Sequence, residues 1–232
     1  EIKSLGRAWR AALERAGHDG PTVVANASDP LVVWSAGTAA NVVWVDTATS
    51  WTGDAALCPA CGTVLATSEG RWDCPGCELT QPAASWVVEG HSIITPHHDE
   101  IRPELRVPGA FNVSNAACAL AAAVELGVNL DAALHGMRTV TAPAGRFATA
   151  TLFGTTARLL LAKNPAGWAE ALPLATSDPV ILAIDSVAAD GKDVSWLWDV
   201  DYEQLQGRRV IATGPRAQDL SVRLAYAEVE HQ

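Results

Sequence analysis

Two Cys-x-x-Cys pairs are the part of the sequence whose residue types point most directly to chemistry. They lie in CPACGTVLATSEGRWDCPGC, residues 58–77, with twelve residues between the pairs. Zn²⁺ takes four thiolate or imidazole ligands in a tetrahedron, and two such knuckles joined by a short hairpin supply them. We therefore predict a zinc ribbon over residues 55–80. Its ligands would be Cys58, Cys61, Cys74 and Cys77.

The expected role of this zinc is structural. Four protein ligands leave no coordination position open for a substrate or a water molecule. The flanking residues are rich in Gly, Pro and polar side chains, so the segment reads as an insertion that needs a metal to hold its fold. Redox chemistry and free thiols are the alternatives for such pairs. Cys118, alone in an Ala-rich run, is expected to pack in the core.

An aspartate after a buried strand is the second candidate. PVILAIDS, residues 179–186, has the apolar run of a buried strand, and ADGKDVSW with Asp193 follows it. In open parallel sheets, functional groups gather outside the carboxyl ends of the strands. Asp193 could therefore present its carboxylate to a neighbour, or make ordinary turn hydrogen bonds. The same turn role is open to Asp190, Asp199 and Asp201.

Three further polar residues could bind a ligand. Asn112 and Asn115 stand three residues apart at the start of a predicted helix, so they share one face and could either cap the helix or contact a ligand. Arg146, in a Pro/Gly break, could reach a phosphate or remain a surface arginine. The roles of Lys163 and Asn164, which follow a predicted strand, are left open by the sequence.

The apolar periodicity predicts an α/β fold. Strand-like runs alternate with helices, which is typical of a parallel, doubly wound sheet. A Pro/Gly break places a domain boundary near residue 144, giving domains 1–144 and 145–232. The expected helices are 2–16, 112–126, 130–138, 167–175 and 216–229. The expected strands are 22–27, 31–34, 41–46, 85–96, 104–109, 179–186 and 208–214, with a hairpin or strand over 152–164.

Composition narrows the class of protein. The 232 residues are 49% hydrophobic, enough to fill a core, and carry a formal net charge of -10. That charge disfavours a nucleic-acid surface, since such a surface needs clustered Lys and Arg. The longest apolar runs are too short to span a bilayer, and we expect a cytoplasmic protein. The chain begins at Glu1 without an initiator Met, so we expect it to be a piece of something larger.

Two stretches resemble motifs of the Mur ligase superfamily. GAFNVSNAACALAAA, residues 109–123, is similar to the Gly-x-His-Asn-x-x-Asn-Ala pattern of its central ATPase domain, with Phe111 where most such ligases have His. PAGRF, residues 143–147, matches the Gly-Arg at the end of that domain. NASDP, residues 26–30, looks like the family's Asn-x-Asp-Asp-Pro turn, with a Ser in place of one Asp.

Three further features narrow the resemblance to the MurT-type family, over nearly the whole chain. They are the four-Cys insertion, AKNPAGW at 162–168 and AADGKDVSWLWDVDYE at 188–203. The resemblance implies a partial Mur ligase central domain carrying the zinc ribbon, followed by a Rossmann-like C-terminal domain that is itself shortened. It also implies that Asn115, assisted by Asn112 and Arg146, contacts the nucleotide.

The resemblance implies a reaction as well. ATP with Mg²⁺ would phosphorylate the α-carboxyl of D-glutamate in the lipid II stem peptide, and ammonia would displace the phosphate to give isoglutamine. The ammonia would come from a GatD-type glutamine amidotransferase, whose catalytic His Asp193 would orient. The family works in the cytoplasm, where a peripheral position at the inner membrane face would bring it to lipid II.

The sequence departs from the family at the phosphate loop. No Gly-x-x-x-x-Gly-Lys followed by Ser or Thr occurs in it, although Mur ligases hold the nucleotide phosphates with such a loop. We therefore expect a fragment that does not hydrolyse ATP by itself. A non-catalytic module that docks a partner enzyme is the rival interpretation. Another Mur-type ligase, such as a folylpolyglutamate or cyanophycin enzyme, is disfavoured by ADGKDVSW and the four cysteines.

Overall fold

The protein forms two compact units. The computed structural model describes residues 2–48, 56–141, 147–185 and 193–232. The N-terminal unit comprises Glu1–Arg106 with Ala110–Thr141, and the C-terminal unit comprises Val107–Gly109 with Ala142–Gln232. Within the described ranges, no helix combines the length and the apolar character that crossing a bilayer requires.

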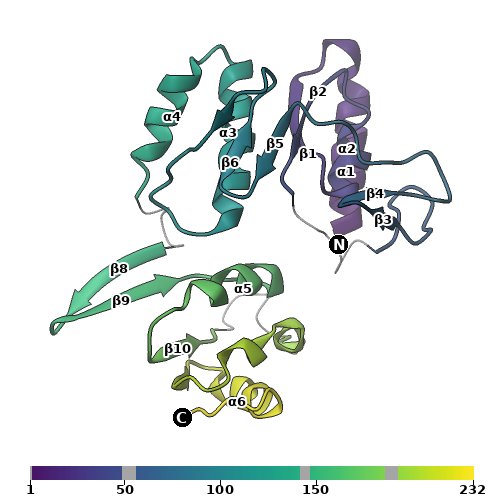
Figure 1. Cartoon of the computed structure of the whole chain (residues 1–232). Coiled ribbons are helices and arrows are strands. Elements are labelled where there is room, and N and C mark those ends of the chain that lie inside the picture. The colour runs from purple at the N-terminus through teal and green to yellow at the C-terminus, as the bar shows by residue number, and fades with distance from the viewer. Residues whose placement is uncertain (1, 49–55, 142–146, 186–192) are drawn as a thin grey trace. The chain divides into compact units, whose positions relative to one another are not determined.

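A mixed five-stranded sheet organises the N-terminal unit (Figure 1). Its strands are β1 (Thr22–Asn26), β2 (Asn41–Asp46), β5 (Trp86–Glu89), β6 (Ser92–Ile94) and β7 (Glu100–Ile101), in that order across the sheet. β1, β2 and β5 run parallel, β6 pairs antiparallel with β5, and β7 pairs antiparallel with β6. The β-branched residues that predicted strands at 22–27, 41–46 and 85–96 therefore lie in one sheet.

Helices cover the parallel part of this sheet. They are α1 (Ile2–Ala16) with the short η1 (Gly17–Asp19), α2 (Pro30–Ala36), α3 (Ala110–Glu125) and α4 (Leu130–Arg138). α3 packs across β1, β2 and β5 with α4 beside it, while α2 packs on β1 and α1 on α2 (Figure 1). The buried core joins Val45 and Trp86 of the sheet to Ala117 and Leu120 of α3. The predicted helices at 2–16, 112–126 and 130–138 are confirmed to within a few residues.

Two strand predictions in this unit were wrong. Residues 31–34 belong to α2 because Asp29 caps this helix, accepting hydrogen bonds from the N–H groups of Leu31 and Val32, and Pro30 fits its first turn. Residues 104–109 form no strand; the short β7 precedes them. Pro103 precedes this stretch and Pro108 lies within it, and proline cannot donate to a strand ladder.

The cysteine segment forms a small antiparallel hairpin. β3 (Ala66–Ser68) pairs with β4 (Arg71–Asp73), and isolated bridges between Leu57 and Val64 and between Asp73 and Thr80 extend it on both sides. The hairpin expected between the two Cys-x-x-Cys pairs is therefore present. It lies in the connection between β2 and β5. We call residues 56–82 the ribbon.

The C-terminal unit contains a parallel strand pair with helices. Its elements are β8 (Phe147–Leu152), β9 (Thr155–Leu160), α5 (Pro165–Ala171), η2 (Leu172–Leu174), β10 (Val180–Ala183), η4 (Ser195–Asp199), η5 (Tyr202–Leu205), β11 (Val210–Thr213) and α6 (Ala217–Tyr226). β10 and β11 pair in parallel, as their apolar runs predicted. Their inward side chains pack with Tyr202, Leu220 and Leu224.

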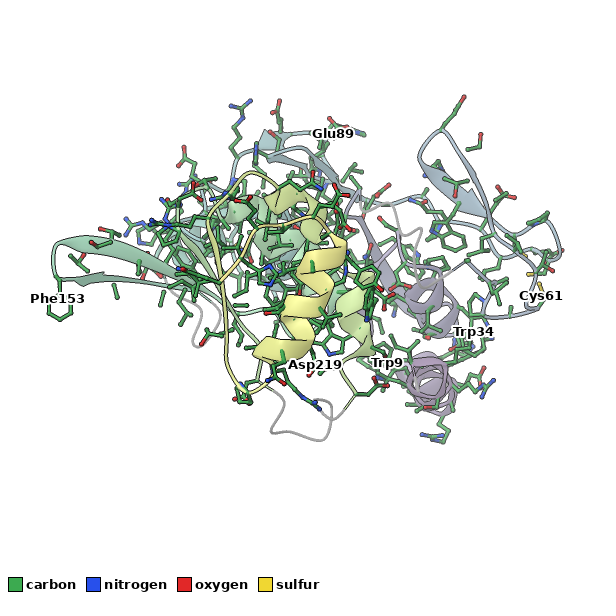
Figure 2. All side chains as sticks on the ribbon, turned by 90° about the horizontal axis from the view of Figure 1, so that it is seen from below. Trp9, Trp34, Cys61, Glu89, Phe153 and Asp219 are labelled. Carbon is green, nitrogen blue, oxygen red and sulfur yellow. The ribbon has the colours of Figure 1, made fainter. Side chains whose placement is uncertain are left out.

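β8 and β9 form a separate hairpin with a tight turn. Phe153 and Gly154 at the turn both have positive φ, 50° and 79°, as a two-residue hairpin loop requires. Phe153 is fully exposed at the tip (Figure 2). The hairpin agrees with the prediction for residues 152–164, although it begins earlier along the chain.

Candidate functional site

The four cysteines of the ribbon come together in space. One sulfur from each of Cys58, Cys61, Cys74 and Cys77 lies within 4.8 Å of the others. Two pairs are closer, with Sγ–Sγ distances of 3.7 Å for Cys58–Cys77 and 3.4 Å for Cys61–Cys74. Four sulfurs at about 2.3 Å from a tetrahedral Zn²⁺ would be roughly 3.8 Å apart. The donor set and its spacing therefore fit a metal ion of this kind.

Local backbone geometry brings the sulfurs together. In the first knuckle, the N–H of Gly62 donates to the carbonyl of Cys58, with Gly62 at a φ of 80°. In the second, the N–H of Gly76 donates to the Cys74 Sγ at 3.4 Å. A Cβ on Gly76 would stand 2.2 Å from the Thr63 Oγ1, so only glycine fits where the second knuckle packs against Thr63.

Without a metal, three of the ribbon thiols differ in pKa. Hydrogen bonding with Thr63, from its side chain first and then its backbone, lowers the pKa of Cys61 to about 6. Burial raises the pKa of Cys74. The hydrogen bond from Leu79 lowers the pKa of Cys77, but burial and the neighbouring thiols outweigh it and raise that pKa to about 12. Repulsion between thiolates opposes ionising all four, and a bound cation removes that opposition.

A polar network joins the carboxyl ends of β1 and β2. The Asn26 Oδ1 accepts hydrogen bonds from the Ser28 N–H at 2.8 Å and the Thr47 Oγ1 at 3.0 Å. The Ser28 Oγ donates to the Asp46 Oδ1 at 2.8 Å and accepts from the Thr47 N–H at 3.0 Å. We call Asn26, Ser28, Asp46 and Thr47 the strand-end network. It lies where parallel sheets bind their ligands.

The ribbon contacts this network directly. The Gln81 Nε2 donates to the Asp46 Oδ2 at 3.0 Å, and the Trp72 Nε1 donates to the carbonyl of Ala27 at 3.2 Å. Both side chains are buried, with 3% of Gln81 and 7% of Trp72 exposed. Among the residues of the network and its ribbon contacts, the sequence pointed only to those in NASDP, residues 26–30. The others were missed because their contacts join positions 35 and 45 residues apart. No local pattern reports such a pairing.

The two predicted nucleotide-contacting asparagines lie in the first turns of α3. Asn115 is exposed, and Asn112, one turn earlier, is half-buried. Ser114, between them, donates from its Oγ to the carbonyl of Thr47 at 3.3 Å. The start of α3 therefore lies beside the strand-end network. Arg146 falls outside the described residues.

Asp193 lies at the start of the segment after β10. Its Oδ1 accepts a hydrogen bond from the Ser195 N–H at 2.9 Å, which forms a local turn leading into η4. This backbone bond, followed by one from the Ser195 side chain, lowers the pKa of Asp193, so the carboxylate is ionised at neutral pH. The residue is exposed. One carboxylate oxygen is thus held locally while the group faces solvent; Asp190 lies outside the described residues.

A buried arginine holds the segment that follows Asp193. Arg223 of α6 donates to both carboxylate oxygens of Glu203 at 2.9 Å and to the carbonyl of Val200 at 2.7 Å. Its guanidinium also lies 5.7 Å from the Trp198 ring and 5.5 Å from the Tyr202 ring. The hydrogen bonds from Arg223 lower the pKa of Glu203 to about 2. The η4 and η5 turns are therefore fastened to α6.

The two residues after β9 differ in their roles. Asn164 caps α5, because its Oδ1 accepts a hydrogen bond from the Gly167 N–H at 2.9 Å. Lys163 is exposed. The question that the sequence left open is thus answered for Asn164 by helix capping, which needs no ligand.

The C-terminal part of the chain matches a described family. The family model is MurT ligase C-terminal, and it matches residues 161–232. This stretch contains Asp193, the Arg223 hydrogen bonds and the β10–β11 pair.

Longer similarities extend to curated and solved proteins. The chain is 31% identical over 189 residues to "Lipid II isoglutaminyl synthase (glutamine-hydrolyzing) subunit MurT" of Staphylococcus aureus (strain COL), covering 75% of this chain and 43% of that protein. It is 26% identical over 196 residues to the protein of the same name from Streptococcus pneumoniae, covering 72% and 42%. The chain therefore spans less than half the length of these relatives.

A solved structure shares the fold. It is a pseudomurein peptide ligase type C from Methanothermus fervidus, with a TM-score of 0.64 at 21% identity. The match covers 93% of this chain and 46% of that one. The arrangement of strands and helices described above is thus found in a peptide ligase.

Proposed function

Because this chain belongs to the MurT-type family of Mur ligases, we propose that it is part of the ligase subunit of a lipid II isoglutaminyl synthase. The reaction would be the ATP-dependent amidation of the α-carboxyl of D-glutamate in the lipid II stem peptide. A carboxylate is a poor electrophile, and phosphorylation gives it a leaving group that ammonia can displace. The proposal is supported most directly by Asp193, an exposed carboxylate within the matched C-terminal region.

Asp193 would serve a partner rather than the ligase reaction itself. A GatD-type glutaminase would supply the ammonia, and its catalytic His would donate a ring N–H to this carboxylate. An ionised aspartate holds an imidazole in one tautomer and stabilises the imidazolium that forms during glutamine hydrolysis. The Ser195 hydrogen bond suits this role, because it orients the carboxylate and lowers its pKa while the side chain stays exposed.

The N-terminal unit would carry part of the nucleotide site. We assign Asn115, with Asn112, to the nucleotide, because they open α3 beside the strand-end network, and Arg146 to its phosphates. Mg²⁺ would accompany ATP and neutralise phosphate charge. Since the sequence contains no phosphate loop, we assign the loop's backbone contacts to no residue of this chain. The central and C-terminal domains would then correspond to residues 1–144 and 145–232.

The four ribbon cysteines would hold a structural Zn²⁺. Their sulfurs form a closed set of four donors, so the metal would stabilise the ribbon and take no part in the reaction. The substrate, lipid II, would place the complex in the cytoplasm at the inner membrane face. Nucleic acid would not be a partner.

The test is glutamine hydrolysis by a complex of this chain with a GatD-type glutaminase. We expect the two to associate, and Asp193→Asn to lower glutamine turnover by roughly 10³- to 10⁴-fold without changing the affinity of the complex, because the amide cannot stabilise the imidazolium. Asp199→Asn is the matched control, since it removes the same charge from another exposed aspartate of the segment and is expected to leave turnover unchanged.

Two results would overturn the proposal. Normal glutamine turnover with Asp193→Asn would remove Asp193 from the reaction. Failure of the wild-type chain to bind the glutaminase in a calorimetric titration would remove the partner.

A further inference from the structure

We infer that Trp72 and Gln81 are positioning residues through which the ribbon holds the strand-end network in place. The ribbon would then be more than a self-contained insertion: its fold would set the geometry at the carboxyl ends of β1 and β2. This inference rests on the proposed function only in treating these strand ends as a ligand-binding edge. Its test measures backbone exchange and needs no amidation.

Trp72 connects the cysteine cluster to the end of β1. It lies on β4, two residues before Cys74, so the indole is on the short strand that leads directly into a metal ligand. Its Nε1 donates to the carbonyl of Ala27, which lies between Asn26 and Ser28 of the strand-end network. Because Trp72 is only 7% exposed, water competes little for this hydrogen bond. A shift of β4 would therefore pull on the turn after β1.

Gln81 connects the ribbon to the end of β2. Its side chain is oriented from within the ribbon, because its Oε1 accepts from the Trp72 N–H at 3.2 Å and its own N–H donates to the Trp72 carbonyl at 3.0 Å. Its Nε2 then donates to the Asp46 Oδ2. The other oxygen of Asp46 accepts from Ser28 and from the Ala48 N–H. Gln81 thus fixes a carboxylate that joins both strand ends.

The residue positioned at the end of these contacts is Asn26. Its Oδ1 is occupied by Ser28 and Thr47, and in the described part of the chain its Nδ2 has no hydrogen-bond partner. The carboxamide therefore has a fixed orientation and two N–H groups left to donate. Trp72 and Gln81 would therefore affect a ligand indirectly, through the orientation of the Asn26 carboxamide.

Three backbone N–H groups report on the network without any ligand. Those of Ser28, Thr47 and Ala48 donate to side-chain oxygens of Asn26, Ser28 and Asp46, respectively. Their hydrogen exchange can be followed by NMR on the zinc-loaded chain. The N–H groups of Ala133 in α4 and Leu220 in α6 donate to the backbone carbonyls of the N-cap residues Asn129 and Arg216 and serve as internal references.

Two variants and a chelator test the inference. Gln81→Ala removes a hydrogen bond to Asp46 of the network, and Trp72→Phe removes one to the carbonyl of Ala27 between two of its members. We therefore expect each variant to speed exchange at the three groups about five- to tenfold, with the references and the zinc content unchanged. Gln81→Glu should have a larger effect than Gln81→Ala, because it places a second carboxylate against Asp46. Gln206→Ala, which removes a similar Nε2 hydrogen bond in the C-terminal unit, should have none.

If both variants keep zinc and leave exchange at Ser28, Thr47 and Ala48 unchanged, the ribbon is an independent insertion and the inference is wrong. Removal of zinc by a chelator should speed exchange at these three groups as well as inside the ribbon. Faster exchange confined to the ribbon would also overturn the inference. A chain that binds no zinc would refute the metal assignment instead, and the two variants would still decide the role of Trp72 and Gln81.

Discussion

The two units of the protein hold their candidate functional segments in different ways. In the N-terminal unit, the strand ends are interlocked by Asn26, Ser28, Asp46 and Thr47, and an insertion reinforces them. In the C-terminal unit, Asp193 bonds, among the described residues, only to Ser195 nearby. The stabilising contacts lie further along the chain, where Arg223 joins α6 to Glu203 and Val200.

This difference matches what each segment would do. A site that binds a small ligand benefits when its polar groups are already fixed, because little ordering is left for binding to drive. A carboxylate meant for a partner protein must stay exposed, so it can be oriented only by the turn beneath it. In both units the supporting residues are more buried than the residues that would act.

Loss of a ribbon cysteine should have the largest effect. Cys74→Ser removes one of four sulfurs from a buried position, and structural zinc sites contribute on the order of 10 kcal/mol to the folding of small metal-binding domains. We expect zinc content to fall below stoichiometry and the ribbon to become sensitive to protease, while the C-terminal unit keeps its fold. Cys118→Ser, outside the cluster, is the control. Full zinc content in the Cys74 variant would contradict the four-sulfur assignment.

Removal of Arg223 should be the largest single effect in the C-terminal unit. Arg223→Ala deletes three hydrogen bonds from a side chain that is 6% exposed. Glu203 is about half exposed, so water compensates for part of the loss, and we expect the free energy of unfolding to fall by about 2 to 3 kcal/mol. Chemical denaturation followed by Trp fluorescence would measure it. Arg209 is exposed, so Arg209→Ala should change the free energy of unfolding by less than about 0.5 kcal/mol. If the two variants lost the same stability, the hydrogen bonds of Arg223 would not be what stabilises this unit.

The same pair predicts a smaller dependence on pH. The pKa of Glu203 is lowered to about 2 from a reference of 4.5, so its contribution to stability is present above about pH 4.5 and is lost as the pH falls toward 2. Unfolding free energies measured between pH 6 and pH 3 should therefore decline less in Glu203→Gln than in the wild type. Parallel curves for the two proteins would contradict this contribution.

Helix caps should give the smallest effects, of similar size in the two units. Asn129 caps α4 through two hydrogen bonds, and Asn164 caps α5 through one. We expect Asn129→Ala and Asn164→Ala each to cost about 1 kcal/mol in thermal or chemical unfolding. A loss of partner binding or of nucleotide affinity with Asn164→Ala at unchanged stability would show that capping is not its only role.

Local patterns in the sequence were sufficient for most elements. The α4 helix and the β10 and β11 strands were predicted because each depends on neighbouring residues, although alternate residues of β10, expected to be a buried strand, are exposed. The β3–β4 hairpin follows from the cysteine spacing, while zinc itself stays a prediction. The helix α2 was missed because its β-branched run outweighed the Asp-Pro start signal, which was visible.

Contacts distant along the chain account for the rest. Gln81 and Trp72 carry no local sign that they reach Asp46 and Ala27, since these contacts exist only once the ribbon has folded back on the sheet. The exposure of Asp193 likewise depends on how the C-terminal unit packs. Its turn with Ser195 was among the possibilities read from the sequence, and its role toward a partner remains a proposal.

The register of β2 with β5 determines how easily the length of the ribbon can change. Val45 pairs with Trp86, and the Ser85 N–H donates to the Trp44 carbonyl at 3.1 Å, so the chain returns to the sheet beside the point where it left. A loop whose ends are fixed side by side loses only about 0.6 kcal/mol for each doubling of its length. Homologues can therefore lengthen or shorten the ribbon at little thermodynamic cost, provided that the stretches bearing Trp72 and Gln81 still reach the sheet.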